Sequence, residues 1–224
     1  MIYFKALVMK VLVKRHQYNN GQTGSVTFIG TVSPAGGNLK EPVTESTKKA
    51  ARCFYALEQN RADQKRYPAV NPIDSYSKYL EYPEIREHLA EKVKPGWVEM
   101  VEKAKNIIRK GKDANDQINI LGDDGVPMSY HELFWKSELV DFVILQQDAF
   151  DAIDALCPIE RQSYMLDLVL GICDKEFTFE DYEQCRNFFK EMINLLRQMN
   201  YSEFQSEKFE NYRQQLTNLL SNGN

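Results

Sequence analysis

The sequence of 224 residues changes character near residue 75, and this change limits the folds open to the chain. Strand and helix signals alternate before that point. After it, apolar residues recur almost throughout at the three- and four-residue steps of an amphipathic helix. Several such helices bury their apolar faces against one another in a bundle. We therefore predict a mainly α fold, in which a small α/β domain over residues 1–75 precedes a C-terminal helical bundle domain over residues 76–224.

The first part carries one clear strand signal. Residues 24–33 are rich in β-branched side chains and are bounded by glycine and by Pro34, which favours a strand. Residues 34–38 contain proline and two glycines, which predicts a turn. Residues 42–60 predict a helix, because four apolar side chains there share one helical face. These side chains are Ala50, Cys53, Phe54 and Leu57.

Helix boundaries are marked along the second part. Pro83 suits the first position of a helix, and a second helix from Trp97 is predicted to stop near Gly111. Ser129 with Glu132 forms a capping box, which is a specific signal for a helix start. Further starts are predicted at Pro158, at Thr178 with Asp181, and at Ser202 with Gln205. The bundle is therefore expected to contain five or six helices.

The charge balance argues against a nucleic-acid partner. Lys and Arg number 28 against 32 Asp and Glu, for a net charge of −4, whereas duplex-binding proteins usually carry a basic excess. The sequence has no apolar run of about 18 residues, the length that a membrane-spanning helix requires. We therefore expect neither nucleic acid binding nor direct membrane insertion.

No complete catalytic site can be assembled from sequence motifs. The histidines are His16, His88 and His131, and none has a nucleophile or acid partner by motif. His131 lies inside the capping box and is expected to be exposed. The phosphate-binding motif G-x-x-x-x-G-K-[ST] does not occur in the sequence. We therefore predict no catalytic residue, and we expect this chain alone to be inactive as an enzyme.

The four cysteines are predicted to be core thiols. No two of them form a C-x-x-C pair, and no histidine lies at zinc-ligand spacing from them. Each lies in an apolar stretch, which favours buried thiols in a reducing compartment. Metal binding is the less favoured interpretation, and no metal site is predicted. The cysteines are Cys53, Cys157, Cys173 and Cys185.

Two aromatic residues have unusual neighbours in the sequence. Tyr67 lies in a segment that Pro68 and Pro72 keep extended. Phe150 lies among amides and acids in the polar stretch QQDAFD at 146–151. An aromatic ring in such a setting can serve as an exposed stacking surface. From the residues alone, a core position is the favoured interpretation for both rings.

Three ordered motifs give the chain a specific resemblance to a known family. They are GSVTFIGTVSPAGG at 24–37 followed by EPVT at 41–44, RYPAVN at 66–71, and LQQDAFD at 145–151. They resemble, in the same order, motifs of the catalytic A (alpha) subunit of V-type and archaeal-type ATP synthases, in which the second reads aromatic-Pro-Ala-Ile-Asn and the third LQQNAFD. The resemblance covers roughly residues 18–220.

The resemblance implies that this chain is the C-terminal portion of such a subunit. In that family the P-loop, the catalytic glutamate and the magnesium-binding segment lie upstream of the GSVT motif. Residues 1–75 would then be the remnant of a nucleotide-binding α/β domain. Residues 1–17 do not follow the family's preceding segment, so an altered start is expected.

The resemblance also implies an adenine pocket. It would be built from the aromatic residue before Pro-Ala, which is Tyr67, and from the Ala-Phe of the third motif, which is Ala149 and Phe150. ATP or ADP with magnesium would occupy the site of the full complex. Because the phosphate contacts are missing here, we expect millimolar or weaker ATP binding by this chain alone.

The remaining implications concern partners. An acidic tip in the helical domain, here Asp123 and Asp124, would contact the central stalk, and the B subunit would alternate with this subunit in a ring. The protein would be cytoplasmic and attached to the membrane through the complex. A different interpretation stays open, in which the chain is a helical protein-interaction module without nucleotide binding.

Overall fold

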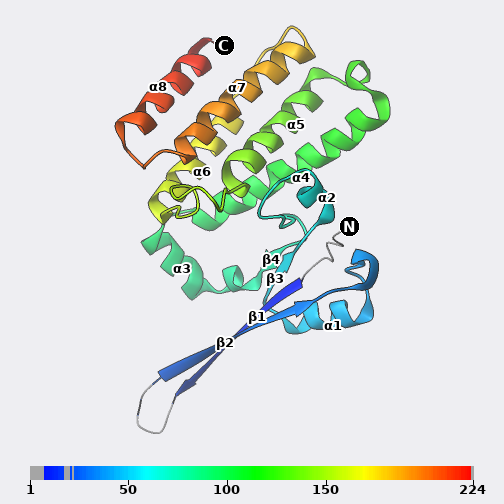
Figure 1. The fold of residues 1–224 in the computed structure, drawn as a ribbon, viewed down its shortest axis with the longest axis vertical. Helices are drawn as coiled ribbons and strands as arrows, with labels where there is room; N and C mark the ends of the chain where they lie inside the picture. Colours follow the sequence, from blue (N-terminus) through cyan, green and yellow to red (C-terminus); the bar gives the residue numbers. More distant parts are fainter. Residues whose placement is uncertain (1–7, 18–20, 22, 223–224) are drawn as a thin grey trace. The chain divides into compact units, whose positions relative to one another are not determined.

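The computed structural model describes residues 8–17, 21 and 23–222 (Figure 1). The chain divides into two compact units, Met1–His88 and Leu89–Asn224, and each is described by itself. The first contains the sheet and short helices, and the second consists of helices. The mainly α class, with a small α/β part before a helical bundle, is therefore confirmed.

A four-stranded antiparallel sheet forms the centre of the first unit. Its order is β2-β1-β3-β4, and β1 pairs with β2 from Val8↔Val32 to Gln17↔Thr23 as a long hairpin (Figure 1). The strand predicted at 24–33 is confirmed as β2. The strands are β1 (Val8–Gln17), β2 (Thr23–Val32), β3 (Cys53–Ala56) and β4 (Tyr76–Ser77).

The helix predicted over 42–60 is wrong in its second half. Helix α1 (Pro42–Ala50) ends at Ala51, and the following residues form β3. β1 supplies the backbone partners for this strand, from Val8↔Ala56 to Val11↔Cys53. The buried Phe54 ring stacks on Tyr76 of β4 at a centroid distance of 5.6 Å. Pairing and core packing outweigh the helical spacing of the apolar residues.

The segment after β3 carries the second sequence motif. Helix α2 (Gln59–Asp63) precedes it. The extended stretch predicted at 67–70 forms only at its end, where Val70 makes an isolated bridge with Leu57, whereas Tyr67 and Pro68 form a bend. Asn71 ends the stretch, and its buried side chain accepts hydrogen bonds from the amides of Ile73 and Asp74. The bridge to Leu57 and the hydrogen bonds of Asn71 therefore hold the end of the motif in place.

The helices expected from residue 83 onward are all present. Their packing buries a continuous apolar core, in which Leu139, Phe189 and Leu196 have no exposed surface. Neighbouring helices in the second unit include the pairs α4 with α5, α5 with α7, and α7 with α8 (Figure 1). The helices are α3 (Pro83–Lys92), α4 (Trp97–Leu121), α5 (Met128–Val140), α6 (Ile159–Cys173), α7 (Tyr182–Asn200) and α8 (Glu207–Asn222). None of the helices in the described residues has both the length and the apolar character needed to cross a membrane.

Gly111 does not end α4 as predicted. The helix continues to Leu121, and Gly111 is buried against Ser137 of α5. A Cβ atom built on Gly111 would lie 2.0 Å from the Ser137 Cβ. The glycine therefore permits the close approach of two helices. In the sequence, a glycine with this role cannot be distinguished from one that ends a helix.

Of the three predicted side-chain caps, the one at α5 is absent, the one at α7 is made by one of its two predicted residues, and the one at α8 is displaced. Helix α5 begins at Met128, and no side chain caps it, so the capping box at Ser129 is not formed. For α7, the Asp181 carboxylate accepts a hydrogen bond from the Gln184 amide at 2.8 Å. At α8, Ser206 accepts from the Phe209 amide, whereas Ser202 is buried and donates to the Gln198 carbonyl. Each helix nevertheless begins within about five residues of its predicted start.

Candidate functional site

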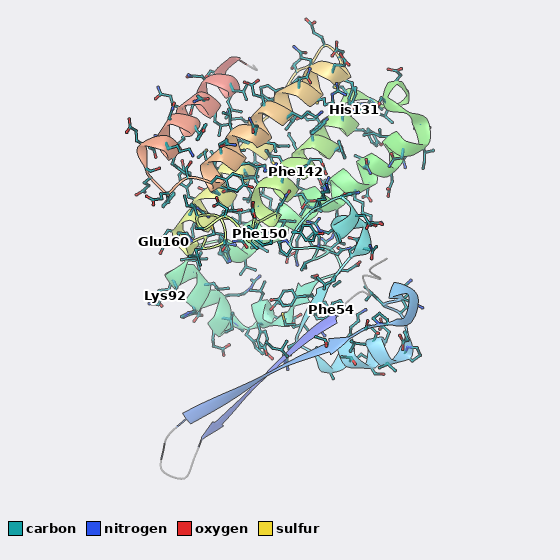
Figure 2. The ribbon with its side chains drawn as sticks, viewed as in Figure 1. Phe54, Lys92, His131, Phe142, Phe150 and Glu160 are labelled. Carbon is teal, nitrogen blue, oxygen red and sulfur yellow. The ribbon has the colours of Figure 1, made fainter. Side chains whose placement is uncertain are left out.

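Phe150 has no buried surface, so the core position favoured from the sequence is wrong. It lies in the irregular segment between the π-helical turn Asp141–Leu145 and α6, and its relative exposure is 101% (Figure 2). Ala149 beside it is exposed as well. A large apolar ring in this position does not stabilise the fold, because none of its apolar surface is buried on folding.

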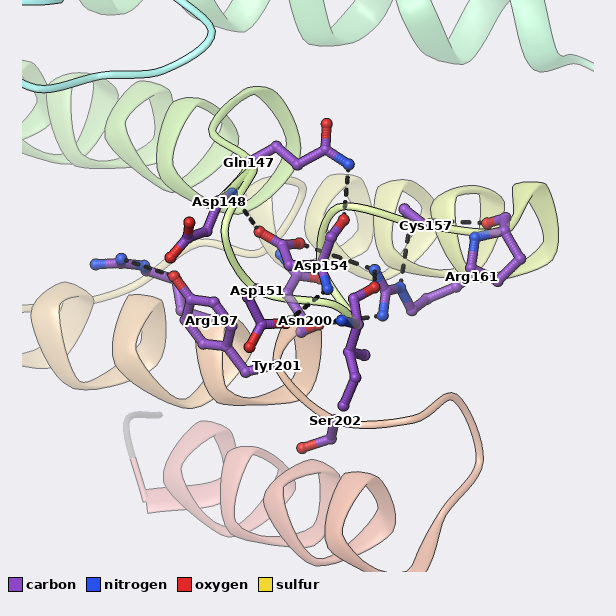
Figure 3. A network of polar contacts seen from close by, with 12 residues as sticks. Gln147, Asp148, Asp151, Asp154, Cys157, Arg161, Arg197, Asn200, Tyr201 and Ser202 are labelled. Atoms are coloured by element: carbon purple, nitrogen blue, oxygen red, sulfur yellow. Dashed lines mark hydrogen bonds and ion pairs between the residues drawn. The ribbon is translucent and has the colours of Figure 1, made fainter.

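Three aspartates hold the backbone of the Phe150 segment. The Asp148 carboxylate accepts a hydrogen bond from the Phe150 amide at 2.9 Å, and the Asp151 carboxylate accepts from the amides of Ile153 and Asp154 (Figure 3). The Asp154 carboxylate accepts in turn from the Asp148 amide at 2.6 Å, which closes the segment on itself. Side-chain bonds of this kind stabilise a turn that has no regular secondary structure.

Arg161 of α6 anchors this turn to the bundle. Its guanidinium is 1% exposed, and it donates to the carbonyls of Ile153 at 3.0 Å and Asn200 at 3.1 Å (Figure 3). It also donates to the Cys157 sulfur and lies 3.8 Å from the Asp154 carboxylate. The Asn200 side chain donates to the Val143 carbonyl at 2.8 Å. One buried cation therefore connects the turn with the end of α7.

The Asp154 carboxyl titrates under opposing influences. Burial raises its pKa above the ordinary value, while the hydrogen bond from the Asp148 amide and the positive charge of Arg161 lower it. A buried carboxylate is stable only when such partners are present. The Arg161 pairing therefore compensates the charge that the turn buries.

Arg161, Asp154 and Asn200 were not identified from the sequence. A signal for Arg161 exists, because it precedes the buried Met165 and Val169 by four and eight residues in α6. That spacing places a cation on the apolar face of an amphipathic helix. Such a position indicates a buried, paired charge.

Tyr67 is also outside the core, with a relative exposure of 45%. Its segment is held by backbone hydrogen bonds from the Glu58 amide to the Ala69 carbonyl and from the Asn71 amide to the Ala56 carbonyl. Its hydroxyl donates to the Ala62 carbonyl at 3.4 Å. Tyr67 belongs to the first unit, and Phe150 belongs to the second. Both residues have aromatic surface accessible to a ligand.

The acidic pair lies at the tip of the α4–α5 hairpin. Asp123 and Asp124 are exposed in a short 3-10 turn, Asp123–Gly125. The last residues of α4 add exposed apolar surface, with Ile120 at 73% and Leu121 at 57%. The tip thus presents carboxylates and aliphatic side chains together, a combination typical of a protein-binding surface.

His131 is buried, and the prediction that it is exposed is wrong. Its relative exposure is 2%, its Nε2 atom lies 2.9 Å from the Asp123 carbonyl oxygen, and its ring packs on Tyr182 at 4.7 Å. Helix α5 begins before Ser129, and the ring of His131 faces α7 through its contact with Tyr182, a partner that the local sequence pattern does not reveal. His131 therefore ties the acidic tip to the bundle.

The cysteines are free thiols, and all but Cys157 are buried. Burial raises the pKa of Cys173 and of Cys185 to about 12, so both are neutral at physiological pH. Cys157 is half-buried and accepts a hydrogen bond from Arg161. Among the residues that the structure describes, no three potential ligand side chains cluster as a metal site would require.

Two family models match consecutive parts of the chain. The ATP synthase alpha/beta family nucleotide-binding domain matches residues 5–77, and the C-terminal domain of V and A type ATP synthase matches residues 86–178. The first match begins at residue 5, so most of the segment 1–17, expected to depart from the family, lies within it.

Curated relatives and a solved structure are similar as well. The V-type ATP synthase alpha chain of Chlamydia abortus is 39% identical over 201 residues, which is 90% of this chain and 34% of the relative. The same protein of Chlamydia pneumoniae is 40% identical over the same shares. The structure of the ATP synthase subunit NeqB from Nanoarcheaum equitans matches over 63% of this chain and 33% of the NeqB chain, with 19% identity and a TM-score of 0.48.

The chain thus spans about a third of the length of the curated relatives it matches. The two family matches keep the order of a nucleotide-binding domain followed by a C-terminal domain. With these matches and relatives, the chain belongs to the family of V-type and A-type ATP synthase alpha chains and corresponds to the C-terminal part of such a chain.

Proposed function

We propose that this chain acts as the C-terminal part of the catalytic A subunit in a rotary V-type or A-type ATP synthase. It contributes Tyr67, Ala149 and Phe150 to the adenine site and Asp123 and Asp124 to contact with the central stalk. The observation that carries the nucleotide role is the fully exposed Phe150 on a turn fixed by a buried arginine. The boundary between a nucleotide-binding part and a helical bundle near residue 75 belongs to the same proposal.

The chemistry of the exposed rings suits a purine. Adenine has flat faces that stack on aromatic side chains, and one such contact is worth about 1–3 kcal/mol. Tyr67 and Phe150 both offer ring surface that folding leaves in water. Ala149 beside Phe150 is small, and it allows a flat ligand to approach the backbone.

Stacking alone gives weak binding. One or two aromatic contacts correspond to a dissociation constant of about a millimolar or more. In this family a P-loop holds the triphosphate and its magnesium ion, and this sequence contains no P-loop motif. Magnesium supplies charge compensation to the phosphates when it is bound, and this chain's own residues bind and orient the base. The groups that contact the phosphates belong to upstream residues of the subunit and to the neighbouring B subunit.

Photolabelling with 2-azido-ADP tests the adenine role. We expect light-dependent incorporation into peptides that contain Tyr67 or Phe150, suppressed by excess ATP and absent from F150A at the second peptide. A matched control is F204A, because Phe204 is a partly buried aromatic residue elsewhere in the same unit. Labelling spread evenly over exposed tyrosines, with no competition by ATP, would leave the chain as a helical interaction module.

The tip of the α4–α5 hairpin supports the stalk contact. Exposed carboxylates at Asp123 and Asp124 attract a basic partner surface, and the adjoining Ile120 and Leu121 can be buried against it. Binding of the stalk subunit to D123N/D124N should weaken and lose its dependence on salt. The control D113N changes an exposed carboxylate earlier on α4 and should bind normally. In this proposal the protein works at the cytoplasmic side of the membrane as part of the complex.

A further inference from the structure

The Phe150 turn contains an unusual combination of exposure and order. Phe150 is entirely in water, yet its amide and those of Asp148, Ile153 and Asp154 are all bonded to carboxylates. An exposed apolar ring on a free loop would sample many positions. The order of this turn must therefore come from elsewhere, because the ring itself contributes no packing.

The only fully buried cation in the described part of the second unit lies directly behind this turn. Arg161 uses its Nη2 atom to donate to the Ile153 carbonyl and its Nη1 atom to donate to the Asn200 carbonyl, at 3.0 and 3.1 Å. Its remaining nitrogen, Nε, donates to Cys157 at the end of the irregular segment. A planar guanidinium has its donors in fixed directions, so these bonds fix the spacing of three chain segments.

The charge of Arg161 has a second effect on the same turn. The Asp154 carboxylate, 7% exposed, needs a compensating charge, and Arg161 supplies it from 3.8 Å. With that charge in place, the carboxylate can accept the Asp148 amide at 2.6 Å and hold the turn closed. Loss of the cation would therefore release the turn at Asp154 as well as at Ile153.

We infer that Arg161 is a positioning residue for nucleotide binding, which sets the conformation of the 148–154 turn so that Ala149 and Phe150 face the base. This inference rests on the proposed adenine role of Phe150. Arg161 itself does not touch the nucleotide. Because the turn is already ordered before the nucleotide binds, binding does not have to supply the entropy cost of ordering the turn. Arg161 should therefore raise the affinity for the nucleotide.

Hydrogen exchange tests the positioning without any nucleotide. The amides of Asp148, Ile153 and Asp154 should exchange about tenfold faster or more in R161M than in wild type, the factor expected for losing one hydrogen bond to a charged group. R161K keeps the charge but not the fork of donors, and it should give an intermediate rate. The control R213M removes an exposed arginine paired with Glu210 and should change none of these amides. Unchanged protection in both Arg161 variants would overturn the inference.

An ADP titration followed by NMR separates this inference from the proposed function. In wild type, the Phe150 amide should shift with ADP in the millimolar range, and in R161M the apparent dissociation constant should rise severalfold. Core amides such as that of Phe189 should keep their positions in both proteins, which excludes general unfolding. If wild type shows no shift at Phe150, the adenine role fails, and the exchange rates alone decide whether Arg161 orders the turn. If R161M binds ADP like wild type, the positioning role is wrong while the adenine role stands.

Discussion

Gly111 of α4 and Ser137 of α5 pack so closely that a Cβ atom on Gly111 would lie 2.0 Å from the Ser137 Cβ and 3.0 Å from the Leu133 carbonyl oxygen. The two helices that carry the acidic tip are therefore in close contact where only the small Ser137 side chain lies between their backbones. Because the Ser137 Cβ is fixed to the backbone and cannot rotate away, α5 itself would have to move to accommodate a methyl group.

The substitution Gly111→Ala should lower the free energy of unfolding. Overpacking costs about 1–3 kcal/mol, and the better helix propensity of alanine offsets up to about 1 kcal/mol of that. Gly171→Ala in α6 is the matched control, because nothing lies within 4 Å of its Cβ position. It should raise stability by about 0.5–1 kcal/mol. Urea unfolding of both variants measures the contrast, and equal effects would show that the approach of α4 to α5 is not tight.

Phe150→Ala should leave stability unchanged within about 0.5 kcal/mol, because the ring buries nothing. Phe189→Ala, at a position with no exposed surface, should cost about 3–5 kcal/mol. Thermal unfolding compares the two. A large loss in the Phe150 variant would mean that the ring is part of the core and not available to a ligand.

His131→Leu should release the acidic tip. The variant loses the contact between Nε2 and the Asp123 carbonyl and the packing of the imidazole on Tyr182. The expected cost is about 1–2 kcal/mol, with faster exchange of the Gly125 amide. His88→Leu changes an exposed histidine and should have little effect on either measurement. Protection of the Gly125 amide that is equal in both variants would contradict an anchoring role for His131.

Alkaline pH should weaken the fold through Cys173. Its pKa is raised from 9.0 to about 12 by burial, so the native state holds the proton that the unfolded chain releases. The stabilisation is therefore complete below pH 9 and is lost as the pH rises toward 12, by up to about 1.4 kcal/mol per pH unit. The free energy of unfolding of wild type minus that of C173A should fall across pH 9–11, while the contributions of other groups cancel. A difference that stays constant with pH would mean that the thiol is not buried as described.

The sequence was sufficient for patterns that depend on local chemistry. The β-branched run at 24–33 forms a strand, and Pro83 and Pro158 mark helix starts, because backbone restrictions act regardless of what packs nearby. The setting of Phe150 among amides and acids is unusual in the sequence, but the core position that the residues alone favoured for it is wrong, because the ring is exposed.

Features that depend on distant partners could not be predicted in this way. Residues 53–56 fit a helical face, and only pairing with β1 makes them a strand. Gly111 looks like a stop because its partner Ser137 lies in another helix. Arg161 was missed for the same reason, because its partner Asn200 lies 39 residues further along the chain, in another helix. Tertiary contacts decided each of these cases.

The most direct test of the account is an ADP titration of the wild-type chain that follows the amide signals of Tyr67 and Phe150 together. Each residue has an exposed ring in its own unit, and both are members of the proposed adenine site. Both signals should shift with one shared dissociation constant of about a millimolar or weaker. Shifts at only one residue, two different constants, or a micromolar affinity would contradict the account.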